Sequence, residues 1–212
     1  FGAFLVQNES LYNVKTTVEW QHAKGLEDLN LPTSKTRYDK LAAVSLISKE
    51  KLPLIIPTPK QLTVSTDDRP TDPHWQIYLS SFFSAHQQDL EQLLAQTAKD
   101  IQWVDTIADA NLIIDQASSL GDEAYQLRID KQKIRLGANT YGGMVYAIQS
   151  LVQIDVAAQT GSNRLPLVDM EDAPRFAYRG FLLDISRNFY GLDKIKQLVD
   201  LMSIYKLNHL DL

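Results

Sequence analysis

Cysteine is absent from the 212-residue sequence, which excludes disulfides, thiolate nucleophiles and cysteine metal sites. The four histidines, His22, His74, His86 and His209, lie far apart and lack the spacing of metal ligands. A glycine-rich nucleotide-binding pattern is missing as well. We therefore predict neither a metal site nor a cofactor.

Long hydrophobic runs are also absent. No run approaches the roughly 18 apolar residues that a membrane helix needs, so we predict no membrane span. The first residue is Phe1, and no basic-then-apolar signal peptide follows it. These features indicate a mature or trimmed product.

Strong charge of one sign is lacking too. The formal net charge is -5, which argues against nucleic acid or an anionic membrane as the main partner. Hydrophobic residues make up 44% of the chain and charged residues 22%, as in ordinary globular domains. A neutral ligand such as a sugar is compatible with this surface.

The first 52 residues carry short strand-like patterns. Residues 4–6 and 14–20 favour strands, the second by strict alternation, and the apolar run 41–47 fits either a helix or a strand. We interpret residues 1–52 as the tail of a β-rich domain. The alternative is an N-terminal extension without a binding role. Three prolines in residues 53–59 then predict an extended connector and a domain boundary.

Strand and helix patterns alternate from about residue 60 to residue 160. Residues 74–79 predict a strand, and residues 87–98 predict a helix with leucines on one face. A short apolar strand is expected at residues 112–114. This alternation is typical of a compact domain that contains both helices and strands.

A hairpin and a second helix follow. The runs 125–129 and 134–136 alternate apolar and polar residues, which predicts an antiparallel hairpin with one solvated face. A helix is expected over residues 141–156, and Gly142 and Gly143 near its start favour close packing over an anion site. We predict an α+β domain over residues 53–168, an antiparallel sheet with two helices.

The segment 172–187, with the sequence DAPRFAYRGFLLDISR, is the most informative part of the chain. Its apolar run Gly180–Ile185 predicts a buried strand, and an amphipathic helix follows Gly191. Residues 208–212 begin another strand. A strand, a helix and a second strand predict the opening of a parallel β/α unit, which we expect to continue beyond Leu212.

Three charged residues of this segment are candidates for chemistry. Arg179 could donate two hydrogen bonds to neighbouring hydroxyls, or form a salt bridge to Asp184 or Asp172. Asp184 and Arg187 lie three residues apart at the carboxyl end of the predicted strand, the end that faces the active site in β/α barrels. We favour structural pairing for these two residues.

The same segment resembles the first barrel strand of glycoside hydrolase family 20, the β-N-acetylhexosaminidases of the bacterial chitobiase type. The matching positions are Asp172, Pro174, Arg175, Phe176, Tyr178, Arg179, Gly180, Asp184 and Arg187. Residues 195–202 and 205–208 resemble the family's first helix and the entry to its second strand. The resemblance implies that residues 169–212 begin a TIM (β/α)8 barrel.

A second match lies upstream. Residues 123–127, 134–136 and 143–151 resemble the small α+β domain that precedes the barrel in this family, and Pro57-Thr-Pro59 resembles its usual entry. The resemblance therefore extends over residues 55–212. Longer chitobiases begin with a β-sandwich domain, so the resemblance implies that residues 1–52 are the tail of such a carbohydrate-binding-like N-terminal domain. One departure is Asp211, which stands where the family usually has the first histidine of its second strand.

The family resemblance implies an exo-acting glycoside hydrolase that retains configuration through substrate assistance. The substrate's acetamido oxygen attacks the anomeric carbon, while an Asp-Glu pair on a later strand orients that group and protonates the leaving oxygen. No such pair appears here in a matching context, so we expect no catalytic residue in this chain. Arg179 is expected to bind hydroxyls of the terminal sugar, and Asp184 and Arg187 to support the site floor.

The expected partners are an N-acetylglucosamine-containing oligosaccharide and the remainder of the barrel. A bacterial periplasmic, outer-membrane-associated or secreted location is expected from the same resemblance. We expect the strand 180–185 and the helix 192–205 to expose apolar faces where the barrel is missing. The alternative is a non-catalytic carbohydrate-binding or scaffold module.

Overall fold

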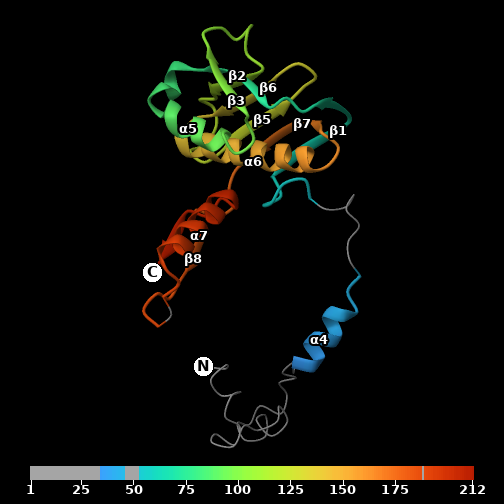
Figure 1. Cartoon of the computed structure of the whole chain (residues 1–212), viewed down its shortest axis with the longest axis vertical. Coiled ribbons are helices and arrows are strands. Elements are labelled where there is room, and N and C mark those ends of the chain that lie inside the picture. Colours follow the sequence, from blue (N-terminus) through green and yellow to red (C-terminus); the bar gives the residue numbers. More distant parts are fainter. Residues whose placement is uncertain (1–33, 46–52, 188) are drawn as a thin grey trace, which may run out of the picture. The chain divides into compact units, whose positions relative to one another are not determined.

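The computed structural model describes residues 34–45, 53–187 and 189–212, and the chain divides into the units Phe1–Leu52 and Pro53–Leu212 (Figure 1). The described part of the first unit contains helix α4, Ser34–Ala42, whose residues are all exposed. The strands expected at residues 4–6 and 14–20 lie outside the described residues. The β-sandwich assignment of residues 1–52 stays a prediction.

The second unit contains a seven-stranded sheet in the order β1-β7-β5-β6-β4-β2-β3. Its strands are β1 Gln61–Pro70, β2 His74–Leu79, β3 Asp100–Val104, β4 Leu112–Gln116, β5 Tyr125–Ile129, β6 Ile134–Ala138 and β7 Arg164–Asp172. Two α-helices accompany the sheet, α5 Gln87–Leu94 and α6 Tyr141–Thr160, and a 3₁₀ helix, Ser81–His86, leads into α5. We call residues 53–172 the small domain.

The prediction of an antiparallel sheet is wrong, because the sheet is mixed. β2 pairs in parallel with β3 and β4, and β4 pairs in parallel with β6. Only the β5–β6, β5–β7 and β1–β7 pairs are antiparallel. The physical reason is the connection between β2 and β3, which runs through α5 and so returns the chain in the same direction.

Several local predictions are confirmed. Strand β2 has the predicted bounds, and β5 and β6 form the predicted hairpin with alternating buried and exposed residues. Both predicted helices are present, although α5 ends at Leu94 and α6 extends to Thr160. The backbone N–H groups of Thr97 and Ala98 both donate to the Leu94 carbonyl, which closes the end of α5.

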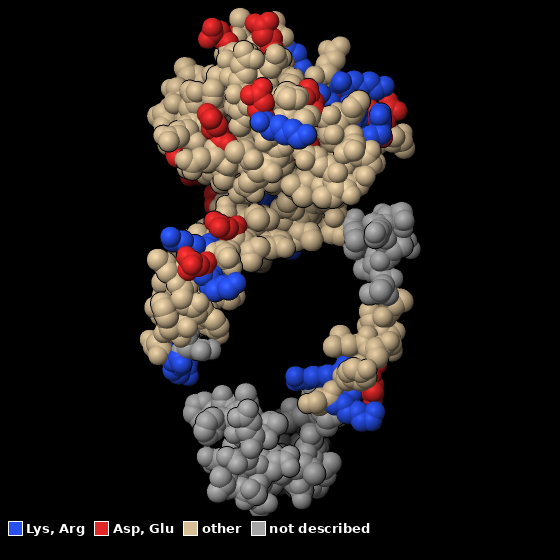
Figure 2. Space-filling model, in the orientation of Figure 1, with Lys and Arg blue, Asp and Glu red and all other residues tan. Residues whose placement is uncertain are grey.

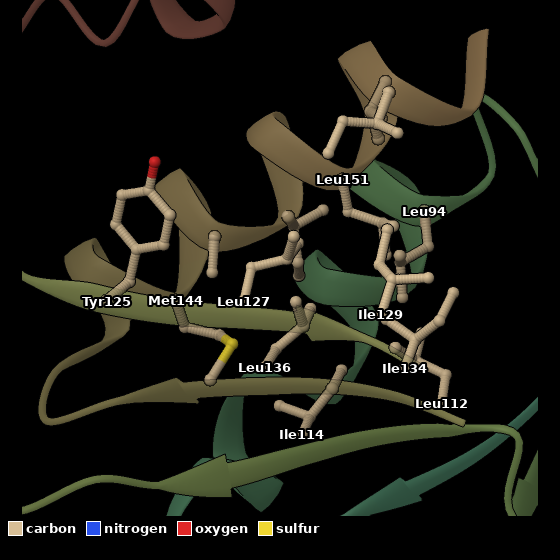
Figure 3. Close-up of a cluster of buried hydrophobic side chains, with 14 of the residues drawn as sticks. Leu94, Leu112, Ile114, Tyr125, Leu127, Ile129, Ile134, Leu136, Met144 and Leu151 are labelled. Carbon is tan, nitrogen blue, oxygen red and sulfur yellow. The ribbon is translucent and has the colours of Figure 1, made fainter. Parts of the chain in front are cut away.

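The core of the small domain lies between the sheet and its helices. Helix α6 packs on β5, β6 and β7, and α5 packs against α6. Figure 3 shows Leu127, Leu136 and Ile114 reaching from neighbouring strands toward the α6 ribbon, where Leu151 points back at them. All four side chains are fully buried. The opposite face of the sheet is polar, and Figure 2 shows charges of both signs scattered over the visible surface of this domain.

Gly143 allows α6 to lie unusually close to the turn before β5. A Cβ at this position would meet the Ala124 carbonyl oxygen at 2.6 Å and the Ala138 Cβ at 3.2 Å. A Cβ at Gly142 would meet only the Thr140 Oγ1, at 3.8 Å. The predicted close packing at the start of this helix is therefore confirmed for Gly143.

We expect Gly143→Ala to destabilise the chain by about 1–3 kcal/mol, because backbone atoms cannot move aside as a flexible side chain can. Gly142→Ala is the matched control, and its higher helix propensity should stabilise the chain by up to about 1 kcal/mol. Urea unfolding of both variants measures the difference. Equal stability of the two variants would contradict the close approach.

The last part of the chain forms a parallel β/α unit, as predicted. Strand β8, Gly180–Leu182, pairs in parallel with β9, His209–Asp211, and helix α7, Leu192–Ile204, connects them. Gly191 precedes α7 with φ of 80°, a conformation that glycine adopts without strain. We call residues 176–212 the C-terminal unit.

The predicted buried strand Gly180–Ile185 is wrong in two respects. The strand ends at Leu182, and its three residues are exposed, with Leu182 at 74%. In the described part of the chain only β9 pairs with β8, so little covers either face. The expected apolar exposure is confirmed here and on α7, where Leu192, Val199 and Leu201 are exposed.

Candidate functional site

Arg179 lies where the C-terminal unit meets the small domain, directly before β8. All five N–H donors of its guanidinium are used. Nε donates to the Lys206 carbonyl at 2.7 Å, and Nη1 donates to the Phe176 carbonyl at 2.6 Å and to Glu123 Oε2 at 3.1 Å. Nη2 donates to Glu123 Oε1 at 2.6 Å and to the Tyr146 hydroxyl at 2.7 Å. The side chain is only 13% exposed.

The pairing of Arg179 with Glu123 corrects one expectation. We predicted that a salt bridge of Arg179 would go to Asp184 or Asp172, and it goes to neither. Those two carboxylates pair with Arg187 and Lys206 instead. The expected sugar contact of Arg179 stays a prediction.

The charges of this cluster reinforce one another. Hydrogen bonds from Arg179 hold the pKa of Glu123 below its ordinary value, and the Tyr146 hydroxyl adds to that effect. Burial raises the pKa of Tyr146, so its hydroxyl stays protonated and donates to Glu123 Oε1 at 3.0 Å. The site therefore holds a carboxylate, a guanidinium and a neutral phenol in mutual contact.

The positions of Glu123 and Tyr146 follow from local packing. Glu123 belongs to the turn that precedes β5, and Tyr146 stands on α6 one turn beyond Gly143. Thr140 caps α6 by accepting from the Gly143 N–H at 3.2 Å, and its hydroxyl donates to the Asp122 carbonyl. The close approach at Gly143 thereby brings Tyr146 to the carboxylate.

The backbone before β8 is held by Asn208. Asn208 Oδ1 accepts from the Arg179 N–H at 2.9 Å, and its Nδ2 donates to the Ala177 carbonyl at 2.8 Å. The Asn208 N–H in turn donates to the Arg179 carbonyl at 2.9 Å. These bonds fix the start of β8 against the start of β9.

A second polar cluster joins the same two parts and is buried. Lys206, 4% exposed, donates to Asp172 Oδ2 at 3.2 Å and to the Tyr125 hydroxyl at 2.5 Å. Tyr125 also donates to Asp172 at 2.8 Å and contacts the Ser150 hydroxyl at 2.7 Å. Burial lowers the pKa of Lys206 more than the Asp172 charge raises it. The ion pair therefore does not fully offset the loss of hydration.

Asp184 and Arg187 form the predicted pair, at the surface. The Asp184 carboxylate accepts from the N–H groups of Ser186 and Arg187 at 3.1 and 3.0 Å and contacts the Arg187 guanidinium. The pKa of Asp184 is lowered, mainly by the Arg187 N–H. The pair closes the turn after β8, and the Arg187 side chain is 84% exposed. Their expected support of a substrate site stays a prediction.

Asp211, which stands where the family usually has a histidine, contacts Tyr178 in this structure. The Tyr178 hydroxyl donates to Asp211 Oδ2 at 2.8 Å, and its ring stacks on His209 with 4.7 Å between centroids. A Cβ on Gly180 would overlap the Tyr178 hydroxyl, so the glycine makes room for this ring. Asp211 thus ties β9 to the segment before β8.

A hollow of about 640 Å³ lies elsewhere, on the polar face of the sheet. Polar and charged side chains line it, including Gln126, Arg128, Arg135, Asp169 and Glu171. No tryptophan, tyrosine or phenylalanine is among its lining residues, so it lacks the aromatic surface on which sugars stack. It does not support a sugar-binding role for the small domain.

Within the described ranges, no three histidines or acidic residues gather closely enough to hold a metal ion. In the same ranges no helix combines the length and apolarity that a bilayer crossing requires.

The sequence singled out Arg179 as a candidate but did not predict its partners. Glu123 lies 56 positions away, and Tyr146 lies 33 positions away. Lys206 was also missed as an interface residue. A lysine between the apolar helix α7 and strand β9 was the available signal, because a charge in such a place needs a partner.

The sequence patterns of one enzyme family match the chain twice in succession. Glycosyl hydrolase family 20, domain 2, matches residues 52–173. The catalytic domain of the same family matches residues 176–212. The two matches meet at the boundary between the small domain and the C-terminal unit.

Individual relatives agree with this family. A beta-hexosaminidase from Porphyromonas gingivalis is 32% identical over 169 residues, covering 73% of this chain and 21% of the relative. An N,N'-diacetylchitobiase from Vibrio harveyi is 32% identical over 130 residues, covering 61% of this chain and 14% of the relative. The chain thus spans about a fifth or less of these relatives.

Solved structures share the fold. A beta-N-acetylhexosaminidase from Bacteroides fragilis superposes with a TM-score of 0.63 at 27% identity, covering 74% of this chain and 32% of that one. An N-acetyl-beta-hexosaminidase from Streptomyces plicatus superposes with a TM-score of 0.63 at 24% identity, covering 76% of this chain and 34% of that one. Because the domain 2 pattern alone spans more than half of the residues, the chain belongs to glycosyl hydrolase family 20.

Proposed function

We propose that the complete protein is a retaining exo-β-N-acetylhexosaminidase, and that this chain supplies its small domain and the first β/α unit of its barrel. The observation that carries the proposal is the order of the two family matches, domain 2 followed by the start of the catalytic domain. A parallel β/α unit, β8-α7-β9, stands where the second match lies. Parallel β/α units are the repeating element of a TIM barrel.

The exposed apolar face of the C-terminal unit supports a continuing barrel. Phe181 and Leu182 on β8 and Leu201 on α7 are exposed at 41%, 74% and 52%. Side chains of this kind are buried when a barrel closes around them. We propose that the remaining barrel strands and helices cover this face.

The proposed chemistry is substrate-assisted hydrolysis. The acetamido oxygen of a terminal N-acetylhexosamine attacks the anomeric carbon while an acid protonates the leaving oxygen. We place the required Asp-Glu pair in the protein beyond Leu212. Asp184 and Arg187 follow β8, at the end of the strand that faces the active site in a barrel, so we assign them to support the substrate site. Arg179 precedes β8, at the opposite end, and we assign it to the interface with the small domain.

The substrate class is proposed from the relatives. One of them is named N,N'-diacetylchitobiase, and a solved Vibrio harveyi relative is an exo beta-N-acetylglucosaminidase in complex with N-acetylglucosamine. An oligosaccharide that ends in N-acetylglucosamine is therefore the substrate we propose.

We expect the complete protein to release the chromophore from a chromogenic β-N-acetylglucosaminide, and residues 1–212 alone to release none. Proton NMR of the first product should show the β-anomer, as retention requires. A folded complete protein that binds the glycoside without turning it over would contradict the proposal. Initial formation of the α-anomer would contradict retention alone.

A scaffold role for the small domain is the second candidate. The ion pairs Arg179–Glu123 and Lys206–Asp172 join this domain to the C-terminal unit. Calorimetry of the whole chain with chitobiose tests it against a carbohydrate-binding role. Millimolar or tighter binding by the isolated chain would favour carbohydrate binding and argue against a mere scaffold.

A further inference from the structure

Lys206 has an unusual backbone conformation at the end of α7. Its φ of 59° lies in the left-handed region, where residues other than glycine are strained. The Lys206 N–H donates to the Ser203 carbonyl at 3.0 Å. The Leu207 N–H donates to the Met202 carbonyl at 2.8 Å. These two bonds form a Schellman motif, in which the left-handed residue is usually glycine.

The side chain of Lys206 explains why a lysine stands in this place. It is 4% exposed, and its ammonium donates to Asp172 and to the Tyr125 hydroxyl of the small domain. The ammonium also lies over the Tyr125 ring, 4.7 Å from the centroid. Glycine would relieve the backbone strain but would lose all of these contacts. A strained backbone persists where the surrounding contacts over-determine it, and such positions are often functional.

The left-handed turn determines how the chain enters β9. It directs the Lys206 carbonyl to Arg179 Nε, which donates to it at 2.7 Å. Two residues later, the Asn208 N–H donates to the Arg179 carbonyl at 2.9 Å. Strand β9 then pairs with β8 in the register that places His209 opposite Gly180. A right-handed Lys206 would continue the direction of the helix and move Asn208 away from this partner.

The register of β9 matters for the active site of a barrel. That site lies at the carboxyl ends of the strands, the end at which Asp184 and Arg187 follow β8. A shift of β9 by one residue would turn each of its side chains to the other face of the sheet. It would also displace the groups that follow Leu212 relative to those that follow β8.

We propose that Lys206 is a positioning residue for the hydrolysis, through which the small domain holds the left-handed turn that sets the register of β9 against β8. The ammonium anchors the turn to Asp172 and Tyr125, and the turn transmits this constraint to the second barrel strand. This inference rests on the proposed function. It gives the small domain an effect on catalysis that does not require contact with the substrate.

The test compares Lys206→Gly/Asp172→Asn with Lys206→Met/Asp172→Asn in the complete protein. Both double variants lack the ion pair, and neither leaves the Asp172 carboxylate without its cation. Methionine keeps the apolar stem, so packing alone predicts that methionine is tolerated better than glycine. Glycine adopts the left-handed turn without strain, so the positioning role predicts the opposite order. With a chromogenic N-acetylglucosaminide, kcat should be about 10-fold higher in the glycine variant, with similar KM in both.

Hydrogen exchange provides a readout that does not depend on activity. The Leu183 N–H donates to the Asp211 carbonyl at 2.8 Å, a bond that joins β8 to β9 in the observed register. Its protection should be about 10-fold greater in the glycine variant than in the methionine variant. If protection or kcat in the methionine variant equals or exceeds that in the glycine variant, the inference is overturned and the proposed function stands.

Tyr205 provides the matched control, because it directly precedes Lys206 and has an ordinary φ of -89°. Tyr205→Met should protect the Leu183 amide at least as well as Tyr205→Gly. A preference for glycine at both positions would show that general flexibility, and not the left-handed turn, favours glycine, and would overturn the inference.

The remaining outcomes are also decisive. If Lys206→Gly/Asp172→Asn does not fold, Lys206→Asn/Asp172→Asn replaces it, because asparagine tolerates the left-handed region better than methionine. A wild-type complete protein without turnover would refute the proposed function. Exchange of the Leu183 amide would then decide by itself whether Lys206 sets the register of β9.

Discussion

Replacing Lys206 by methionine is expected to cost about 3–5 kcal/mol of stability at the interface between the small domain and the C-terminal unit. The substitution removes the ammonium and leaves the Asp172 carboxylate, only 8% exposed, without an opposite charge. The Lys60 N–H and the Tyr125 hydroxyl would still donate to Asp172, at 3.0 and 2.8 Å. Neutral donors do not compensate a buried charge.

The lowered pKa of Lys206 adds a second expectation. Because burial costs this charge more than its partner returns, removing both charges should recover much of the loss. In the double variant Lys206→Met/Asp172→Asn, the amide oxygen can take the place of Oδ1 and accept from the Lys60 N–H, while the amide NH₂ takes the place of Oδ2 and can donate to the Tyr125 hydroxyl. We expect this double variant to be more stable than Lys206→Met alone.

Hydrogen exchange shows which part of the chain loses stability when Lys206 is replaced. Amides of α7 should lose protection in Lys206→Met, while those of α6 in the small domain keep theirs. Lys194→Met is the matched control, since Lys194 lies on α7 and its exposed ammonium contacts only Gln197 among the hydrogen bonds found, at 3.0 Å. Similar protection in the two lysine variants would show that the buried ion pair does not hold the C-terminal unit.

The sequence predicted those elements whose pattern is local and whose burial is one-sided. Strand β5 alternates buried and exposed residues, and its partner β6 lies within a few positions, so the hairpin follows from periodicity. Strand β1 was missed because eight of its ten residues are exposed, and Pro70 ends it. The parallel β2–β3 pair was missed because its register depends on the packing of α5, which no short pattern encodes.

The site was predictable to a smaller extent. Arg179 stood out because it precedes an apolar run and lies in a recognisable motif. Its partner Glu123 comes from a turn that is distant in sequence, and several carboxylates were equally plausible from spacing alone. Asp184 was expected inside the strand, but the strand ends at Leu182, so Asp184 closes a turn instead. Pairings across a domain boundary require the three-dimensional arrangement.

Arg179→Ala in the complete protein is expected to lower stability by about 1–3 kcal/mol, because it removes the guanidinium that joins Glu123 to the Phe176 and Lys206 carbonyls. The same change leaves Glu123 with the Tyr146 hydroxyl as its remaining partner in this cluster. KM should stay within about twofold of wild type, because Arg179 precedes β8 and so lies at the opposite end of the strand from the active site of a barrel.

Arg175→Ala provides the comparison, since Arg175 is an exposed arginine of the same segment, four positions before Arg179. Thermal unfolding of both variants reports stability, and initial rates well below the melting temperature report activity. Equal stability of Arg179→Ala and Arg175→Ala would show that the Arg179 guanidinium does not join the two domains. If Arg179→Lys is destabilised as much as Arg179→Ala, the join requires the forked donor, because lysine keeps the charge but cannot donate in two directions from one plane.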